Sequence, residues 1–242
     1  MKKKNKKDYS NKRFILVFIM MLCLIISMST YWVYAYHHKY GKNYYEDKFI
    51  SYKVSDYVTI EGNYVYLKNI SDDISNNFIR SQKEIIKNNI IDMTVTKGIY
   101  KEILSIKISY ILNADLSNYE EVLTLNIDLR NKKVLNNDDI LNKINVSYKE
   151  IATDIFNEYI KVSNNQKVID IITDEEMTGN EFNNNSEKYI IRIREKLPEV
   201  MKVYIDKEHV YYLVRKNEIT KVCYYTNTDI NIGYINKEIG KI

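Results

Sequence analysis

Hydrophobic side chains are most concentrated near the N-terminus, where residues 14–36 contain no charged residue. At 1.5 Å per helical residue this run spans roughly 34 Å, enough to cross the apolar core of a bilayer. The pattern therefore predicts one transmembrane helix, with amphipathic aromatic side chains at the lipid interface of its far end. The residues expected to anchor it are Phe14, Leu16, Phe18, Leu22, Leu24, Ile26, Tyr31, Trp32, Tyr34 and Tyr36.

Beyond a polar stretch at residues 37–48, the pattern changes first to alternation and then to a helical period. Residues 50–70 alternate apolar and polar side chains on both sides of Glu61-Gly62-Asn63, which predicts one or two strands with a turn. In residues 71–89 the apolar positions recur three, four and seven apart. Because Ser71, Asp72 and Asp73 are candidates to cap this segment, an amphipathic helix is expected there.

Three strand-like runs follow, and they predict an antiparallel meander. They cover residues 91–100, 103–112 and 121–129 and are separated by polar residues. Within residues 105–110 and 124–129 the alternation is strict. One face of the sheet is therefore expected to be buried, while the other face meets water or a helix.

A turn and two helices are expected next. Asn131-Lys132-Lys133 predicts the turn, and a short helix is expected from residues 136–139 through Leu141. Asp138-Asp139 would lie at its start, where carboxylates favour the helix dipole and capping. A longer helix is expected over residues 146–162, with Ile151, Ile155, Tyr159 and Val162 on one face.

The C-terminal third is less regular, and residues 163–187, which are Asn-rich and acidic, are expected to form a loop or a frayed helix. Further strands are expected over residues 189–193, 200–205, 210–214 and 218–225. The predicted fold class is α+β: an antiparallel sheet with two or three packing helices, preceded by one transmembrane helix. The expected parts are a tail (1–13), the transmembrane helix (14–36), a juxtamembrane stalk (37–48) and an α+β domain (49–242).

Charge determines the expected orientation in the membrane. Residues 1–13 hold seven of the 36 Lys and Arg residues and one of the 32 acids, so the remainder is near neutral at −2. Positive charges beside a transmembrane helix stay in the cytoplasm, which places residues 49–242 outside it. This location of the charge also argues against nucleic-acid binding. The topology-determining residues are Lys2, Lys3, Lys4, Lys6, Lys7, Lys12 and Arg13.

A cleaved signal peptide is the alternative to an anchor, because Ser27-Met28-Ser29 loosely resembles a cleavage site. Apolar and aromatic residues continue beyond that site to Tyr36, which favours the anchor. Cys23 lacks the preceding small residues of a lipoprotein cysteine. With Cys223 alone in the rest of the chain, no intramolecular disulfide is expected outside the membrane.

Motifs for catalysis and cofactor binding are scarce. The sequence contains no phosphate-binding glycine loop, no G-x-S-x-G and no H-E-x-x-H. His209, expected in a turn, would need a serine or Cys223 brought close by folding to act as a hydrolase base. Asp174-Glu175-Glu176 with Gly179, Asn180 and Glu181 could attract calcium, but the spacing departs from an EF-hand and favours a solvated acidic loop. His37-His38 is interpreted as a solvated pair. Because none of these motifs is convincing, no enzyme activity, cofactor or metal is predicted.

Two stretches carry a resemblance to a known module. The first is residues 123–135, LTLNIDLRNKKVL, followed by Asp138-Asp139-Ile140-Leu141; the second is residues 203–214, VYIDKEHVYYLV. Together with the preceding strand and helix, they resemble the extracytoplasmic module of lysozyme-sensing anti-sigma factors, which also occurs in cell-wall polysaccharide deacetylases. In that resemblance residues 203–214 are the closing hairpin, and coverage runs from about Ile50 to the end.

The chain departs from that module in ways that narrow its expected role. The family's Gly- and His-containing turn between the second and third strands is replaced by residues 113–118. A tail of residues 1–13 is too short to fold into a sigma-binding segment, and no deacetylase catalytic domain is recognised. The resemblance therefore implies a sensor or binding domain alone.

The leading hypothesis is a non-enzymatic, membrane-anchored domain that binds a lysozyme-like protein or a glycan of the cell wall. The 23 tyrosines suit such a binding surface, although half-buried strand positions explain them equally well. The alternative is a structural bitopic subunit of an envelope or type IV secretion complex. Expected partners are the lipid bilayer and this external ligand.

Overall fold

The structure is a computed structural model that describes residues 20, 21, 24, 26–31, 52–87, 89–113, 118–225 and 233–242. The chain divides into two compact units, residues 1–51 and 52–242. In the first unit the described residues are helical, and Leu24, Ile26 and Tyr31 are exposed. Among the described residues, no helix has the length and apolar character needed to cross a membrane.

Several predictions fall on residues that the structure does not describe. They concern the basic tail, most of residues 14–36, the stalk with His37-His38, and most of the 113–118 turn. The anchor and topology residues outside the described set are Lys2, Lys3, Lys4, Lys6, Lys7, Lys12, Arg13, Phe14, Leu16, Phe18, Leu22, Trp32, Tyr34 and Tyr36.

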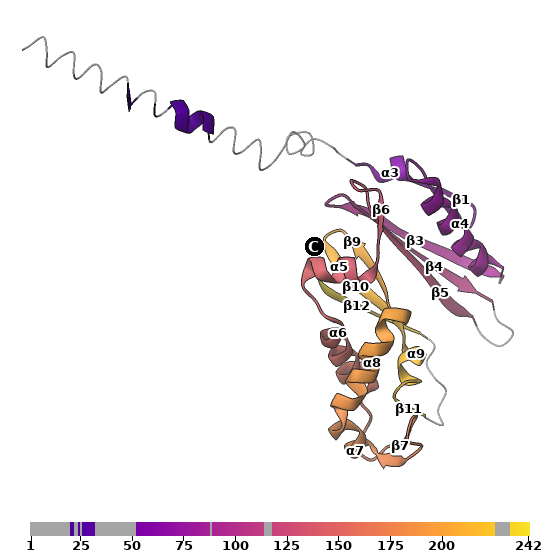
Figure 1. Cartoon of the computed structure of the whole chain (residues 1–242). Helices are drawn as coiled ribbons and strands as arrows, with labels where there is room; N and C mark the ends of the chain where they lie inside the picture. Colours follow the sequence, from indigo (N-terminus) through magenta and orange to yellow (C-terminus); the bar gives the residue numbers. More distant parts are fainter. Residues whose placement is uncertain are drawn as a thin grey trace, which may run out of the picture. The chain divides into compact units, whose positions relative to one another are not determined.

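The second unit is α+β with antiparallel sheets and several helices, as the pattern predicted (Figure 1). Its N-terminal half contains a hairpin, a helix and a four-stranded meander ordered β3-β4-β5-β6. The 50–70 segment begins with a helical turn where a strand was expected. The elements are α3 (Val54–Tyr57), β1 (Val58–Glu61), β2 (Tyr64–Leu67), α4 (Asp72–Ile86), β3 (Ile90–Tyr100), β4 (Ile103–Leu112), β5 (Tyr119–Asp128) and β6 (Lys133–Leu135).

One face of the meander is covered by α4 and the β1-β2 hairpin, as Figure 1 shows. Leu104, Ile106 and Ile108 of β4 are fully buried there with Phe78 of α4. The buried Gln82 side chain joins the layers, because its amide accepts from the Val65 N–H (2.8 Å) and donates to the Val65 carbonyl (2.7 Å). A polar side chain on the buried helix face thus supplies the hydrogen bonds of a neighbouring strand.

The C-terminal half forms a second core from helices and two small sheets. Within the described residues these sheets are ordered β12-β10-β9 and β11-β7-β8. The elements are α5 (Asn137–Ile144), α6 (Tyr148–Ile155), the π-turn η1 (Phe156–Ile160), β7 (Lys167–Asp170), β8 (Glu176–Thr178), α7 (Gly179–Asn184), α8 (Ser186–Val200), β9 (Lys202–Asp206), β10 (His209–Arg215), α9 (Lys216–Thr220), β11 (Tyr224–Tyr225) and β12 (Tyr234–Lys241).

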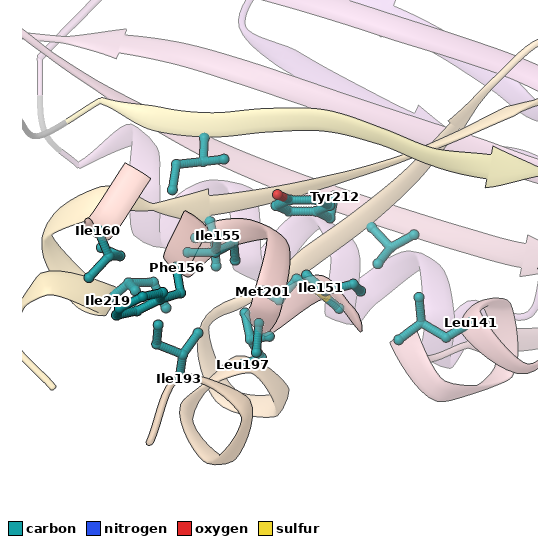
Figure 2. Packing of buried hydrophobic residues seen from close by; sticks show 14 of the residues in the cluster. Leu141, Ile151, Ile155, Phe156, Ile160, Ile193, Leu197, Met201, Tyr212 and Ile219 are labelled. Carbon is teal, nitrogen blue, oxygen red and sulfur yellow. The ribbon is translucent and has the colours of Figure 1, made fainter. Parts of the chain in front are cut away.

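Side chains from these helices and from β10 point toward one another in the second core (Figure 2). Ile151 and Ile155 are buried in the expected helix of residues 146–162. The π-turn then inserts an extra residue per turn, so Phe156 and Ile160 become the buried residues. Tyr159 and Val162, expected on the same face, are only partly buried.

The expectations for three segments of the C-terminal third, residues 163–187, 189–193 and 218–225, are wrong. Residues 189–193 lie in helix α8, because Tyr189, Ile193 and Leu197 are buried at four-residue spacing. Most of residues 218–225 belong to α9 and a turn, with only Tyr224–Tyr225 in a strand.

Residues 163–187 are ordered as β7, β8 and α7, and not as a loop or frayed helix. They are held by a capping box in which the Thr178 side chain accepts from the Glu181 N–H and the Glu181 carboxylate accepts from the Thr178 N–H. Strand β12 was not anticipated from the sequence.

The polar face of the meander packs against β9, where water or a helix was expected. Ser105 on β4 accepts a hydrogen bond from the Ile205 N–H (2.8 Å), and the Asn126 amide on β5 donates to the Val203 carbonyl (2.8 Å). A third side chain, Asn137 of α5, donates to the Met201 carbonyl (2.8 Å). Side chains of the meander and of α5 therefore pair the outer edge of β9 in place of a neighbouring strand.

Candidate functional site

A groove with acidic side chains runs along helix α6 and is the strongest candidate site. Two hollows, of about 760 Å³ between α5 and α6 and about 330 Å³ between α6 and β12, lie next to each other and share Val146 and Glu150 in their linings, and we call the two together the acidic groove. The residues lining this acidic groove are Asp138, Leu141, Asn142, Asn145, Val146, Ser147, Tyr148, Glu150, Ile151, Asp154, Glu238 and Ile239. Among the described residues that line it, four are acidic and none is lysine, arginine or histidine.

Local sequence explains how α5 and α6 present their acids. Asn136 and Asp139 form a capping box at the start of α5, and Ser147 and Glu150 form one at the start of α6. The capping expected for Asp138-Asp139 is thus confirmed for Asp139. The neighbouring Asp138 is left exposed toward the groove, where it interacts with the Tyr148 hydroxyl. Burial and this carboxylate together raise the pKa of Tyr148, so the phenol stays protonated.

One lysine partly offsets the negative charge beside the groove. Lys237 on β12 contacts Asp154 and Glu158 of the α6 segment, with both Nζ–O distances at 2.6 Å. Burial opposes its charge, but the two carboxylates outweigh this and raise the pKa of Lys237. The cluster of one lysine and two acids keeps a net negative charge next to Glu150.

The most enclosed charged side chain lies elsewhere, at the end of β7. The Asp170 carboxylate is fully buried and accepts hydrogen bonds from the Tyr189 hydroxyl (2.8 Å) and from Arg192 (3.1 Å). Lys188 contacts it at 2.9 Å. Although burial alone would raise the pKa of Asp170, these partners and two backbone N–H groups hold it well below its ordinary value. A carboxylate so fully paired is structural, because it has no free lone pair for a substrate.

His209 and Cys223, the residues considered for a hydrolase, have different surroundings in the structure. His209 is the first residue of β10, and not part of a turn as expected, and its Nδ1 lies 2.7 Å from the Glu238 carboxylate. Cys223 is fully buried in the second core, where burial raises the pKa of its thiol to about 12. Within the described residues no hydrogen bond or ion pair connects His209 to Cys223 or to a serine.

The residues considered for calcium binding have local roles. Glu176 forms an ion pair with Lys167 across the β7-β8 pair, and Glu181 caps α7. Asp174 lies in the turn between the strands with a φ of 59°. Among the described residues, no group of three or more His, Cys, Asp or Glu side chains is arranged to hold a metal ion.

Sequence reasoning missed the acidic groove because its residues come from distant segments. Asp138 and Glu150 each have a local explanation as helix-start acids, and β12 was not predicted. The available signal was the acidic spacing of Glu150, Asp154 and Glu158, which lie four residues apart on one helix face. The abundance of tyrosine did not help to locate a binding surface, because Tyr110, Tyr189 and Tyr212 are fully buried while Tyr225 is exposed.

No protein-family model matches the sequence, and no curated protein matches it. The stretches that carry the resemblance have the expected secondary structure: residues 123–135 span β5, a turn and β6, and residues 203–214 form the β9-β10 hairpin. The kinship itself stays a prediction.

Proposed function

We propose that this chain is a membrane-anchored, non-enzymatic binding or sensor domain that recognises a cationic protein at the cell wall. A lysozyme-like protein that presents a basic surface is the leading ligand. The observation that carries the proposal is the acidic groove, whose lining has four acidic residues and no lysine, arginine or histidine. Complementary potential steers a partner and fixes its orientation more than it adds raw affinity.

The arrangement of charge favours a protein ligand over a neutral glycan. Glu150, which lines both hollows, is exposed, and the side chain of Asp154 is 37% exposed. Sugar-binding sites commonly stack the sugar on aromatic rings, whereas Tyr148 is the only aromatic residue among the described residues that line this groove. A lysine- or arginine-rich surface matches it better.

The membrane location rests on the sequence. The uncharged run at residues 14–36 is long enough to span a bilayer, and the basic residues before it favour an internal N-terminus. The second unit would then lie outside the cell, facing the wall. This anchored arrangement suits a sensor or capture domain.

A retention experiment tests the binding proposal. The full chain in detergent micelles is immobilised and exposed to lysozyme or to purified peptidoglycan at several salt concentrations. We expect lysozyme to be retained, and retention to weaken as salt rises, because the groove charges are exposed. Failure to retain either material would contradict the proposal, and retention of peptidoglycan alone would reverse the choice of ligand.

The triple variant Asp138→Asn, Glu150→Gln, Asp154→Asn tests whether lysozyme binds at the groove. Glutamine can still complete the capping box of α6, so the fold should survive. We expect about tenfold weaker lysozyme binding, or about 1.4 kcal/mol. The matched control replaces three exposed acids outside the groove, Glu61, Glu84 and Asp206, with their amides. Equal losses in both variants would point to net charge and not to the groove.

A structural bitopic subunit is the second candidate, and one observation favours it. Strand β3 is the first strand of the meander and pairs only with β4 in the described residues, and its Ile91 side chain is 55% exposed. Long exposed edge strands are templates for pairing with another chain. Cross-linking of the full chain in membranes into oligomers, lost on Ile91→Lys, would support this role.

A further inference from the structure

Within the described residues, hydrogen bonds close only one of the two edges of the sheet β12-β10-β9. At the β9 edge, Asn137, Asn126 and Ser105 pair the backbone groups of Met201, Val203 and Ile205. These are alternate residues, as expected for the groups that one strand directs to one side.

The β12 edge is open over its central residues. The Lys216 N–H bonds the Gly233 carbonyl, so the backbone groups of Ile235 and Lys237 turn toward β10 while those of Asn236 and Glu238 turn away. Within the described residues, no hydrogen bond reaches the backbone N–H or carbonyl of Asn236 or Glu238. Both residues are exposed, so their outward groups have no partner from the described part of the chain.

This open edge lies beside the acidic groove. Glu238 and Ile239 of β12 line the same hollow as Ile151, Glu150 and Asp154 of α6. An extended segment laid along β12 would therefore have apolar surface for its alternate side chains and carboxylates within reach of the others.

We propose that the outer edge of β12 binds an extended, lysine- or arginine-bearing segment of a partner protein as an added strand. The inference rests on the proposed function, and it specifies how the cationic ligand is held. Backbone hydrogen bonds to Asn236 and Glu238 provide the register, and Glu150 and Asp154 select basic side chains. A second copy of this chain is disfavoured as the occupant, because pairing two β12 edges would bring two acidic grooves together.

The probe is an alternating Lys-Val peptide of about ten residues, titrated into the full chain in detergent micelles. A Glu-Val peptide of equal length tests charge, and a Lys-Val peptide N-methylated on alternate residues tests backbone pairing. We expect the plain Lys-Val peptide to bind at least about tenfold more tightly than either control. Equal binding of the N-methylated peptide would overturn strand addition, and equal binding of the Glu-Val peptide would overturn the charge selection.

Amide hydrogen exchange of the wild-type chain directly tests whether the backbone N–H groups at the β12 edge are free and whether the peptide pairs with them. Without peptide, the N–H groups of Ile235 and Lys237 should exchange slowly and those of Asn236 and Glu238 quickly. Addition of the Lys-Val peptide should slow exchange at Asn236 and Glu238. Binding without such slowing would place the peptide elsewhere and refute the inference.

Asn236→Pro removes one outward donor without removing a bond to β10, and prolines are tolerated at such edge positions. Asn236→Ala is the matched control, since both variants lose the contact of the Asn236 side chain with the Tyr204 hydroxyl. We expect about tenfold weaker peptide binding for proline than for alanine. If lysozyme is retained but unaffected by Asn236→Pro, the proposed function stands and this binding mode fails; if lysozyme is not retained at all, the proposed function fails as well.

Discussion

Asp170 illustrates how one buried side chain organises its surroundings. It lies at the end of β7, and its partners Tyr189, Arg192 and Lys188 all belong to α8. Its Oδ1 also accepts from the backbone N–H groups of Ile172 and Thr173, which shapes the following turn. A strand, a helix and a turn thus meet on one carboxylate.

Asp170→Asn should destabilise the protein strongly. The amide cannot accept all of these hydrogen bonds and leaves the partly buried Arg192 without its counter-ion, and breaking an ion pair with a buried member costs about 3 to 5 kcal/mol. Urea unfolding of the purified chain measures the difference. Asp174→Asn in the exposed neighbouring turn is the control and should change stability little; similar losses for both would refute the role given to Asp170.

The same carboxylate should make stability depend on pH. The pKa of Asp170 is lower in the folded protein than in the unfolded chain, whose value is about 3.9, so the unfolded state binds the proton more readily. Its contribution is complete above pH of about 4 and is lost as the pH falls toward the lower pKa of the folded state. Unfolding free energies measured across acid pH should therefore fall less steeply for Asp170→Asn than for the wild type.

Gly179 is required by a close backbone approach. A Cβ added there would lie 2.0 Å from the Ser163 carbonyl oxygen, which is backbone and cannot rotate away. We expect Gly179→Ala to lower stability by about 1 to 3 kcal/mol or more, the range of overpacked cores. Gly98→Ala, with no atom within 4 Å of the added Cβ, is the matched control in thermal unfolding. Equal melting temperatures for the two variants would contradict this explanation.

At the scale of elements, side chains complete hydrogen-bond patterns that strands leave open. Gln82 does this for Val65 of β2, and Ser105 and Asn126 do it for β9. The serine and asparagine lie on the meander face that alternation alone assigned to water or a helix. Polar alternation there reflects a sheet-to-sheet contact made through hydrogen bonds.

Ser105→Ala should weaken this contact. The Ile205 N–H would be left buried without an acceptor, which costs about 1 to 3 kcal/mol. Ser109→Ala is the control. Ser109 lies four residues further along β4 on the same face, and its hydroxyl has no hydrogen bond within the described residues. Denaturant unfolding followed by tyrosine fluorescence compares the two, and equal effects would show that only polarity at the face matters.

At the scale of the whole molecule, the main question is whether residues 14–36 hold the chain in the membrane. If residues 14–36 anchor the chain, it should stay with membranes through an alkaline wash, and protease added to cells without an outer barrier should remove residues 52–242. Lysine at both Leu22 and Leu24 should release it, because charge at a helix centre is costly. A soluble polypeptide trimmed after Ser29 in the medium would instead indicate a cleaved signal peptide.

Local hydrophobic patterns were sufficient to predict the secondary structure of segments that bury one face. The hairpin at Gly62, helix α4 and the three-stranded part of the meander were predicted because their alternation or helical period matches one buried face. The capping role of Asp139 was likewise local. Helix α8 was mistaken in part for a strand, because Tyr189-Ile190-Ile191 is a short apolar run whose period is ambiguous over so few residues.

The sequence by itself determined the α+β class of residues 52–242 and most elements of residues 52–162. Only the tertiary structure decided that β12 joins β10, that Asp170 meets α8, and that Glu150, Asp154 and Glu238 line one groove. The reason is that amphipathic periods depend on neighbouring residues within one segment. A groove or an edge depends on which distant segments pack together, and no period along the chain encodes that choice.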